Sequence, residues 1–263
     1  MVYGVLNSIR SLISKFSATK LFLTWDRGYV MKKALYPGYK KKAEVMTVEQ
    51  REQFTIQFDH LYNFLSCLGV KCCFQDGVEA DDIIAFLANK RCIQQQETED
   101  FITIVPPIII VSADHDLYPL LKDDEVVMYK LHRSSIYTAS DFRKEFSELE
   151  PIQFTEVQAL MGCSGDKVPG VRGIGPKFAV DLIKRYGSVR AIKDTVEEDR
   201  LVELVQDRWE DVELSMKLVA FENVEPVLLC QPPNLGKIRK LLYAWELNEF
   251  IEDWSFIENL SQL

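Results

Sequence analysis

An apolar run leads straight into two acidic residues in the stretch that reads Ile108-Ile109-Ile110-Val111-Ser112-Ala113-Asp114-His115-Asp116. A short run of β-branched apolar residues is typical of a strand that is buried on both faces of a parallel sheet. Functional groups in such sheets collect at the carboxyl ends of the strands. The stretch therefore predicts an α/β fold with Asp114 and Asp116 at the functional edge of the sheet.

Two further stretches bring acidic residues to the same edge. A short strand at residues 20–25 ends at Asp26, and a second strand at residues 70–74 leads into a helix. The first turn of that helix holds three acids, namely Glu79, Asp81 and Asp82. Strands that alternate with helices predict βαβ units around a parallel sheet, with another strand at residues 126–129.

Each acidic group also has an ordinary structural explanation. Acids in the first turn of a helix are stabilised by the helix dipole, and an aspartate after a strand is common turn chemistry. The three groups together are harder to explain, because like charges repel and burial raises carboxyl pKa values unless cations neutralise them. Oxygen ligands without paired His or Cys spacing favour Mg²⁺ or Mn²⁺ over zinc.

A glycine-rich segment follows this region. Residues 162–177 read Gly-Cys-Ser-Gly-Asp-Lys-Val-Pro-Gly-Val-Arg-Gly-Ile-Gly-Pro-Lys. Positive φ and close backbone approach are possible at three glycines, Gly170, Gly173 and Gly175. Pro176 suits the first position of a helix, with Lys177 in its first turn. Amides at such a helix N-terminus bind a backbone phosphate without reading bases.

Charge and composition limit the class of protein. The net charge of −9 argues at first against a nucleic-acid partner, but an acidic metal site and a basic face can share one molecule. Basic and tyrosine residues do alternate at residues 29–42, which fits base stacking and phosphate binding as well as it fits a solvated loop. No apolar run approaches the roughly 20 residues that span a bilayer. The six cysteines and three histidines lack zinc-motif spacing.

Four segments, in order and in spacing, resemble the 5′-nuclease family, which includes phage flap endonucleases and the 5′-nuclease domain of bacterial DNA polymerase I. They are residues 36–40 (Tyr-Pro-Gly-Tyr-Lys), 77–82 (Gly-Val-Glu-Ala-Asp-Asp), 112–116 (Ser-Ala-Asp-His-Asp) and 165–170 (Gly-Asp-Lys-Val-Pro-Gly), the last leading into the glycine-rich segment. The resemblance covers most of residues 1–190 and is more specific than any single motif.

The resemblance implies a two-part fold. Residues 1–140 are expected to form a PIN-like domain, with a parallel central sheet, flanking helices and a helical arch. Residues 141–263 are expected to form an all-helical region. Within it, residues 151–190 would form a helix–three-turn–helix of the helix-hairpin-helix type, which in the family grips duplex DNA, often around a potassium ion.

The resemblance also implies roles for individual residues. It assigns metal binding to an acidic set, namely Asp26, Glu79, Asp81, Asp82, Asp114, Asp116 and Asp166. Two basic residues are implied to be catalytic, since Lys40 matches the residue that contacts the scissile phosphate and Lys32 matches a second one at the base of the arch. DNA contacts are implied for Lys41, Lys42, Gly173, Gly175 and Lys177. Two Mg²⁺ or Mn²⁺ ions would then support phosphodiester hydrolysis.

Two departures from the family pattern stand out. Family members begin with a strand that ends in a metal-binding aspartate, and this chain shows no counterpart before its first helix, so we expect a start upstream, a fragment or a degenerate relative. Cys163 stands where the family has an aspartate for the second metal. A neutral thiol is a poor ligand for magnesium, which predicts a weakened second site.

Two functions therefore remain open. The first is a 5′–3′ exonuclease or 5′-flap endonuclease that acts in DNA replication or repair on DNA with 5′ ends, flaps or branched junctions. The second is a catalytically impaired relative that binds such DNA without efficient chemistry. In either case we expect a monomer without a membrane partner, encoded by a bacterium or phage and working in the cytoplasm.

Overall fold

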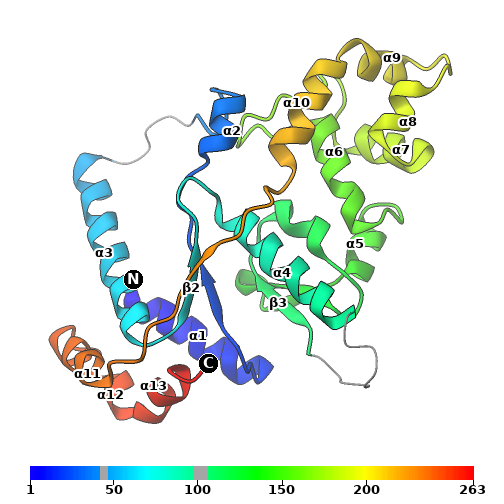
Figure 1. Ribbon diagram of the computed structural model, residues 1–263. Coiled ribbons are helices and arrows are strands. Elements are labelled where there is room, and N and C mark those ends of the chain that lie inside the picture. Colours follow the sequence, from blue (N-terminus) through cyan, green and yellow to red (C-terminus); the bar gives the residue numbers. More distant parts are fainter. Residues whose placement is uncertain (42–46, 97–105) are drawn as a thin grey trace. The chain divides into compact units, whose positions relative to one another are not determined.

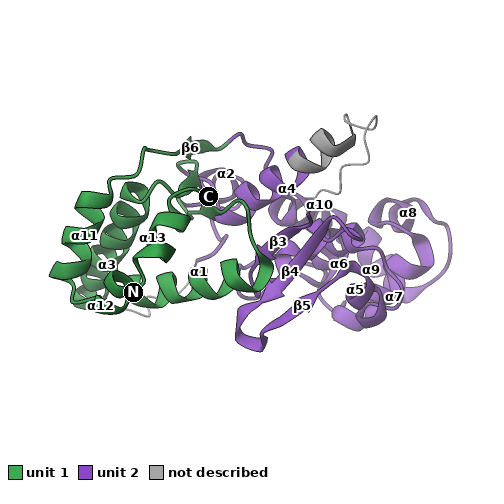
Figure 2. Ribbon diagram, turned by 90° about the horizontal axis from the view of Figure 1, so that it is seen from below, with its two compact units in different colours: residues 1–27, 43–76, 226–263 green, residues 28–42, 77–225 purple. Residues whose placement is uncertain are grey.

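The computed structural model describes residues 1–41, 47–96 and 106–263, which fall into two compact units. Unit 1 combines residues 1–27, 43–76 and 226–263, and unit 2 combines residues 28–42 and 77–225 (Figure 2). This division differs from the boundary expected near residue 140, because the end of the chain folds together with its beginning.

Unit 1 contains a three-stranded sheet. Its central strand, β2 (Lys71–Phe74), pairs in parallel with β1 (Phe22–Thr24) and antiparallel with β6 (Val227–Leu229). The two strands expected at residues 20–25 and 70–74 are thus confirmed. Strand β6 was not expected, since it lies in the part of the chain that was predicted to be all-helical.

Helices from both ends of the chain enclose the core of unit 1. They are α1 (Val2–Phe16), α3 (Val48–Cys67), α11 (Leu235–Ala244), α12 (Asn248–Glu252) and α13 (Trp254–Leu260) (Figure 1). Helix α3 begins with a capping box, in which the Gln50 amide donates to the Thr47 hydroxyl over 3.2 Å and the Thr47 amide donates to the Gln50 side chain over 3.0 Å. Phe64 and Phe250 are fully buried in one apolar cluster, so the C-terminal helices complete this core.

Unit 2 contains a second three-stranded sheet. Strand β4 (Val126–Lys130) pairs in parallel with β3 (Ile108–Val111) and antiparallel with β5 (Ser135–Tyr137). Only a short turn connects β4 to β5, and a parallel crossover needs a dozen or more residues, so this pair must be antiparallel. The expectation of one parallel sheet is therefore corrected to two mixed sheets, one in each unit.

The remaining elements of unit 2 are mostly helical. They are α2 (Val30–Leu35), α4 (Ala80–Gln96), η1 (His115–Leu120), η2 (Leu131–Arg133), α5 (Ala139–Glu145), η3 (Pro151–Gln153), α6 (Phe154–Met161), α7 (Pro176–Tyr186), α8 (Val189–Asp194), α9 (Arg200–Asp207) and α10 (Trp209–Val219). One apolar cluster joins Ile110 and Met128 of the sheet to Leu160 and Ile183 of the helices. The sheet and the helices of this unit therefore share one core. No helix within the described ranges is both long and apolar enough to cross a membrane.

The glycine-rich segment forms a tight connection between α6 and α7. Gly170 has φ 61°, and a Cβ atom placed there would lie 2.4 Å from the backbone nitrogen of Gly162. Gly173 is also at positive φ, whereas Gly175 is extended at φ −90°, which corrects the expectation for that glycine. Pro176 is the first residue of α7, as the sequence predicted.

Replacement of Gly170 by alanine should lower the free energy of unfolding by more than about 1 kcal/mol, because alanine is strained at positive φ and its Cβ would clash. Gly175→Ala is the matched control, since no described atom lies within 4 Å of a Cβ built there. Urea unfolding followed by circular dichroism measures both variants. Equal losses of stability in the two would contradict the close backbone approach at Gly170.

Candidate active site

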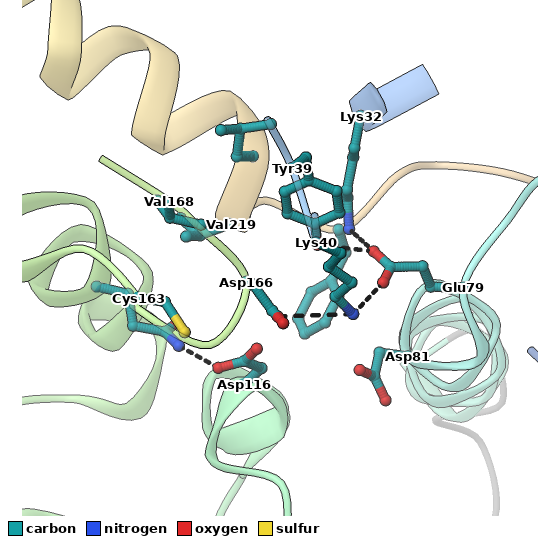
Figure 3. A pocket seen from close by; sticks show the side chains of 13 residues that line it. Lys32, Tyr39, Lys40, Glu79, Asp81, Asp116, Cys163, Asp166, Val168 and Val219 are labelled. Carbon is teal, nitrogen blue, oxygen red and sulfur yellow. Dashed lines mark hydrogen bonds and ion pairs between the residues drawn. The ribbon is translucent and has the colours of Figure 1, made fainter. Parts of the chain in front are cut away.

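A cavity in unit 2 is lined mainly by charged and polar side chains that come from separate segments of the chain (Figure 3). The charged and polar ones are Lys32, Tyr39, Lys40, Glu79, Asp81, Asp116, Gln158, Cys163 and Asp166, and the apolar wall is formed by Val168, Leu218, Val219 and Phe221. Most of the acids come from the ends of strands and the starts of helices, as the sequence pattern predicted.

Glu79 is the most heavily paired acid of the cavity. Its side chain is almost fully buried, with 3% of the residue exposed. Lys32 donates to it over 2.8 Å, the Tyr39 hydroxyl donates over 3.0 Å, and Lys40 donates to its other oxygen. Burial raises the pKa of Glu79, but the two lysines outweigh burial and leave the pKa below its usual range. Glu79 is therefore ionised and neutralised by protein groups alone.

Asp82 lies on the same first turn of α4 but has a different environment. It is 1% exposed, its oxygens lie 3.4 Å from the Lys32 ammonium, and one of them accepts the Glu222 backbone N–H over 2.8 Å. Burial raises the pKa of Asp82, and Lys32 opposes this rise. Among the described residues Asp82 is not part of the cavity lining. Its contacts attach the segment after α10 to α4, and its predicted role as a metal ligand remains a prediction.

Asp81, Asp114 and Asp116 carry negative charge that the protein neutralises less completely. Burial and then repulsion from Asp114 raise the pKa of Asp81 to about 7, against the opposing effect of Lys40. Burial and Asp114 also raise the pKa of Asp116, although the Gln158 amide donates to that carboxylate. Asp114 caps η1 by accepting the Asp116 backbone N–H over 3.0 Å. The surplus of negative charge therefore lies where β3 runs into η1, opposite α4.

Lys40 connects the two kinds of acid. Its ammonium pairs with Glu79 and lies 3.5 Å from an oxygen of Asp166. Its backbone N–H donates to the Asp166 carbonyl over 2.8 Å, so the turn at residues 36–40 is attached to the glycine-rich segment. Burial lowers the pKa of Lys40, but the bond to Glu79 and the nearby acids have a larger, opposite effect. The pKa of Lys40 therefore lies above its usual value. Lys40 has φ 48°, a conformation that is uncommon for a residue other than glycine and therefore marks a constrained position.

Most of the predicted site residues come together in unit 2, and a few do not. Asp26 follows β1 in unit 1, so its predicted role in metal binding remains a prediction. Lys41 is exposed after the turn, and Lys42 lies outside the described residues. Gly173, Gly175 and the exposed Lys177 lie at the start of α7, outside the cavity lining of the described chain. Cys163 does line the cavity.

Sequence reasoning missed several residues that form the site. Gln158 holds Asp116 from the middle of α6, and Glu222 holds Asp82 through its backbone. Nothing in the local pattern distinguishes Gln158 from any other polar residue in a helix. The backbone N–H of residue 222 can donate whatever side chain the residue carries, so only the tertiary structure could identify this contact.

The donors of the cavity fit a hard divalent cation. Asp81, Asp116 and Asp166 line the cavity, and Asp114 lies two residues before Asp116. All four offer carboxylate oxygens, the ligand type that magnesium and manganese prefer. Mutual repulsion between Asp81, Asp114 and Asp116 is the condition that a cation relieves. Among the described residues no group of three or more His, Cys, Asp or Glu side chains is already close enough to hold an ion. Binding would thus require these carboxylates to draw closer together.

Two family models match this chain. One, described as the N-terminal resolvase-like domain of 5′–3′ exonuclease, matches residues 1–147, and the other, described as the C-terminal SAM fold of 5′–3′ exonuclease, matches residues 149–230. These matches confirm the predicted α/β region followed by a mainly helical region.

Two known proteins that align with almost all of this chain support the family matches. The 5′–3′ exonuclease of Aquifex aeolicus (strain VF5) is 29% identical over 259 residues, which cover 96% of this chain and 84% of that protein. The thermostable DNA polymerase I of Thermus thermophilus is 28% identical over 265 residues, which cover 98% of this chain but 30% of the polymerase. This chain therefore spans less than a third of the length of that polymerase.

A solved structure supports the fold. The bacteriophage T5 5′-exonuclease with bound zinc has a TM-score of 0.69 and 24% sequence identity, and the match covers 83% of this chain and 80% of that one. At this identity the likeness concerns the fold alone.

Replacement of Asp81 by asparagine should stabilise the metal-free protein at pH 8. The pKa of Asp81 is about 7 in the fold and near 4 in the unfolded chain, so stability falls as pH rises through this window. Removal of the charge should raise the free energy of unfolding by roughly 2 kcal/mol at pH 8 and by little at pH 4. Urea unfolding in EDTA measures this, with the exposed Asp181→Asn as control. A gain in the free energy of unfolding that does not depend on pH would contradict the raised pKa of Asp81.

Proposed function

This chain belongs to the 5′–3′ exonuclease family, and on that basis we propose that it is a metal-dependent nuclease that hydrolyses DNA phosphodiester bonds near 5′ ends or at flap junctions. One observation carries the proposal, namely that Asp81 and Asp116, which line the cavity together with Lys40, are repelled by each other and by the neighbouring Asp114. A purely structural acidic cluster would have its charges paired, as those of Glu79 and Asp82 are.

Four aspartates at the cavity or next to it would hold the divalent ions. We assign this role to Asp81, Asp114, Asp116 and Asp166, and propose Mg²⁺ or Mn²⁺ as the physiological ions. When bound, such ions supply an activated water and stabilise the leaving oxygen of the phosphodiester. Gln158 fixes one carboxylate of this set by donating to Asp116, which limits the rearrangement needed for binding.

Lys40 is the residue that we propose to stabilise negative charge on the scissile phosphate. Its ammonium lies between Glu79 and Asp166 at the cavity, and a fixed positive charge is most effective where it needs no reorganisation during the reaction. Lys32 lines the cavity but is 7% exposed, and it is paired with Glu79 and Asp82. Its burial favours a role in which Lys32 holds Glu79 in place, over direct contact with the substrate.

The start of α7 is proposed as the contact for the DNA backbone. The N-terminal amides of a helix attract phosphate, and Lys177 in the first turn is exposed. Such contacts position the duplex without reading its sequence, in keeping with a nuclease that recognises structure. We propose further contacts by Lys41 and Lys42, a potassium ion at the glycine-rich connection, metal binding by Asp26, and action as a monomer in the cytoplasm.

The alternative is a relative with impaired chemistry that binds DNA. Cys163 favours it, because a thiol lines the cavity at the position where an acid is implied for the second metal. The two functions share the fold and the proposed DNA contacts, so binding measurements alone do not separate them. Cleavage does separate them.

Asp114→Asn should reduce Mg²⁺-dependent cleavage of a 5′-flap substrate by roughly a hundredfold or more, because a proposed ligand loses its charge. Binding of the same DNA with Ca²⁺ in place of Mg²⁺ should change little. Gel assays of labelled flap DNA measure cleavage, and fluorescence anisotropy measures binding. Asp124→Asn, in the exposed turn before β4, serves as the control. If the unaltered chain binds flaps but does not cut them, the impaired relative is the correct function.

Cys163→Asp should increase both the affinity for Mn²⁺ and the rate of cleavage. The substitution adds a hard oxygen ligand at the cavity, where the thiol binds magnesium or manganese poorly. Calorimetry measures metal affinity, and Cys163→Ser controls for loss of the thiol alone. If the aspartate variant resembles the serine variant in both measurements, the prediction that Cys163 weakens the second metal site is wrong.

A further inference from the structure

The segment between α6 and α7 carries part of the cavity, since Cys163, Asp166 and Val168 all line it. Backbone hydrogen bonds close this segment at its base. Cys163 and Val168 exchange two of them, over 3.1 Å and 2.9 Å. The Val171 N–H donates to the carbonyl of Leu160 in α6 over 2.7 Å. The place of Asp166 therefore depends on how this short segment is anchored.

A buried serine from another helix supplies one further anchor. The Gly170 N–H donates to the Ser215 hydroxyl over 3.0 Å, although 45 residues separate the two in the sequence. Ser215 lies on α10 and is fully buried. Burial of a hydroxyl costs free energy unless the hydroxyl is hydrogen-bonded, so the bond to Gly170 accounts for a serine at this position.

Gly170 has little freedom to pair with anything else. It is buried, its φ is 61°, and a Cβ atom built there would lie 2.4 Å from the nitrogen of Gly162. The backbone of Gly170 is thus packed closely against the end of α6. If the Ser215 hydroxyl were removed, the Gly170 N–H could reach water only through a movement of the segment that carries Asp166.

The helix that carries Ser215 also forms part of the cavity wall. Leu218 and Val219 follow Ser215 by one turn of α10, and both line the cavity. Leu218 belongs to the same apolar cluster as Val168. A polar contact at Gly170 and apolar packing at Val168 therefore fix the segment against α10.

The same segment contacts the lysine that is proposed to act on the phosphate. The Asp166 carbonyl accepts the Lys40 backbone N–H over 2.8 Å, and one Asp166 carboxylate oxygen lies 3.5 Å from the Lys40 ammonium (Figure 3). A shift of the segment would therefore displace Asp166 from Lys40 as well as from the other acids of the cavity.

We propose that Ser215 is a positioning residue for the metal site, an inference that rests on the proposed nuclease function. Its bond to Gly170 keeps Asp166 in the cavity that Asp81 and Asp116 also line. Without the hydroxyl the segment populates arrangements that bind a divalent ion poorly, and the apparent affinity falls with the fraction that is competent to bind. Ser215 itself is not among the residues that line the cavity in the described chain.

Ser215→Ala should bind Mn²⁺ about fivefold more weakly than the unaltered protein, because a buried N–H that loses its acceptor favours movement of the segment. Calorimetry of the DNA-free protein measures this affinity. Val212→Ala is the matched control, since Val212 lies one turn earlier on α10 and is also fully buried in the core of unit 2. It should lower the thermal stability comparably but keep the affinity for Mn²⁺ within about twofold.

Amide hydrogen exchange shows whether the contact itself is lost. Ser215→Ala should speed exchange of the Gly170 N–H about tenfold relative to the amides of β4, because local opening of the segment no longer breaks a hydrogen bond. Val212→Ala should speed exchange at Gly170 and in β4 alike, because it lowers the stability of the whole unit.

Asp166→Asn separates positioning from a general effect on the fold. This change removes the ligand that Ser215 is inferred to position, and it should weaken Mn²⁺ binding by itself. Addition of Ser215→Ala to Asp166→Asn should then cause no further loss of affinity, because the effects of two residues that act as one unit are not additive.

Two results would overturn the positioning role. Equal Mn²⁺ affinity of Ser215→Ala and the unaltered protein would show that the hydroxyl serves stability alone. A full additional loss in the double variant would show that the hydroxyl does not act through Asp166. Failure of the proposed function is recognised separately, since it appears as Mn²⁺ binding that Asp166→Asn leaves unchanged or as an unaltered protein that cuts no flap DNA in Mg²⁺.

Discussion

A carboxylate with almost no access to water needs positive charge beside it, and in this protein Glu79 receives that charge from two lysines of one preceding segment. Removal of either partner from a buried ion pair leaves an uncompensated charge, which is far more costly than the pair itself is stabilising. Lys40 also holds Asp166 through its backbone and its side chain. Helix α2, the turn at residues 36–40, the start of α4 and the glycine-rich segment are thus positioned by one ionic network.

This network divides the acids of the site into two groups. Glu79 and Asp82 are satisfied by lysines and by a backbone amide, and they organise the cavity. Burial, and then repulsion from Asp114, raises the pKa values of Asp81 and Asp116, whose charges the protein does not fully pair and which a cation could therefore neutralise. The incompletely paired acids lower the stability of the fold but remain able to bind cations. This balance between paired and unpaired acids is expected of a site that must bind ions before it can react.

The core of unit 2 extends this organisation to the edge of β3. The same cluster that packs the helices against the sheet contains Tyr118, and Tyr118 supports the ring of His115. A rigid core therefore ends in an exposed aromatic face beside the acids. The segment that follows α10 is held in the same way, since Glu222 donates to a carboxylate at the start of α4. The contact of Glu222 ties the start of α4 to a part of the chain that lies 140 residues away.

Local patterns determined much of this protein from the sequence alone. The strands that end in acids, the capping box at Thr47 and the start of α7 at Pro176 depend on neighbours within a few residues, so a reader of the sequence can predict them. The family resemblance supplied the fold and the acidic set for the same reason, because its motifs are short and ordered along the chain.

Tertiary structure alone decided how the charges are shared and how the strands are grouped. Lys32 meets Glu79 across 47 residues of sequence, Gln158 meets Asp116 across 42, and Glu222 meets Asp82 across 140. The unexpected strands β5 and β6 make two mixed sheets where one parallel sheet was predicted. Such contacts depend on which surfaces the packed core brings together, and a periodic pattern of apolar residues specifies that a face is buried without specifying what lies against it.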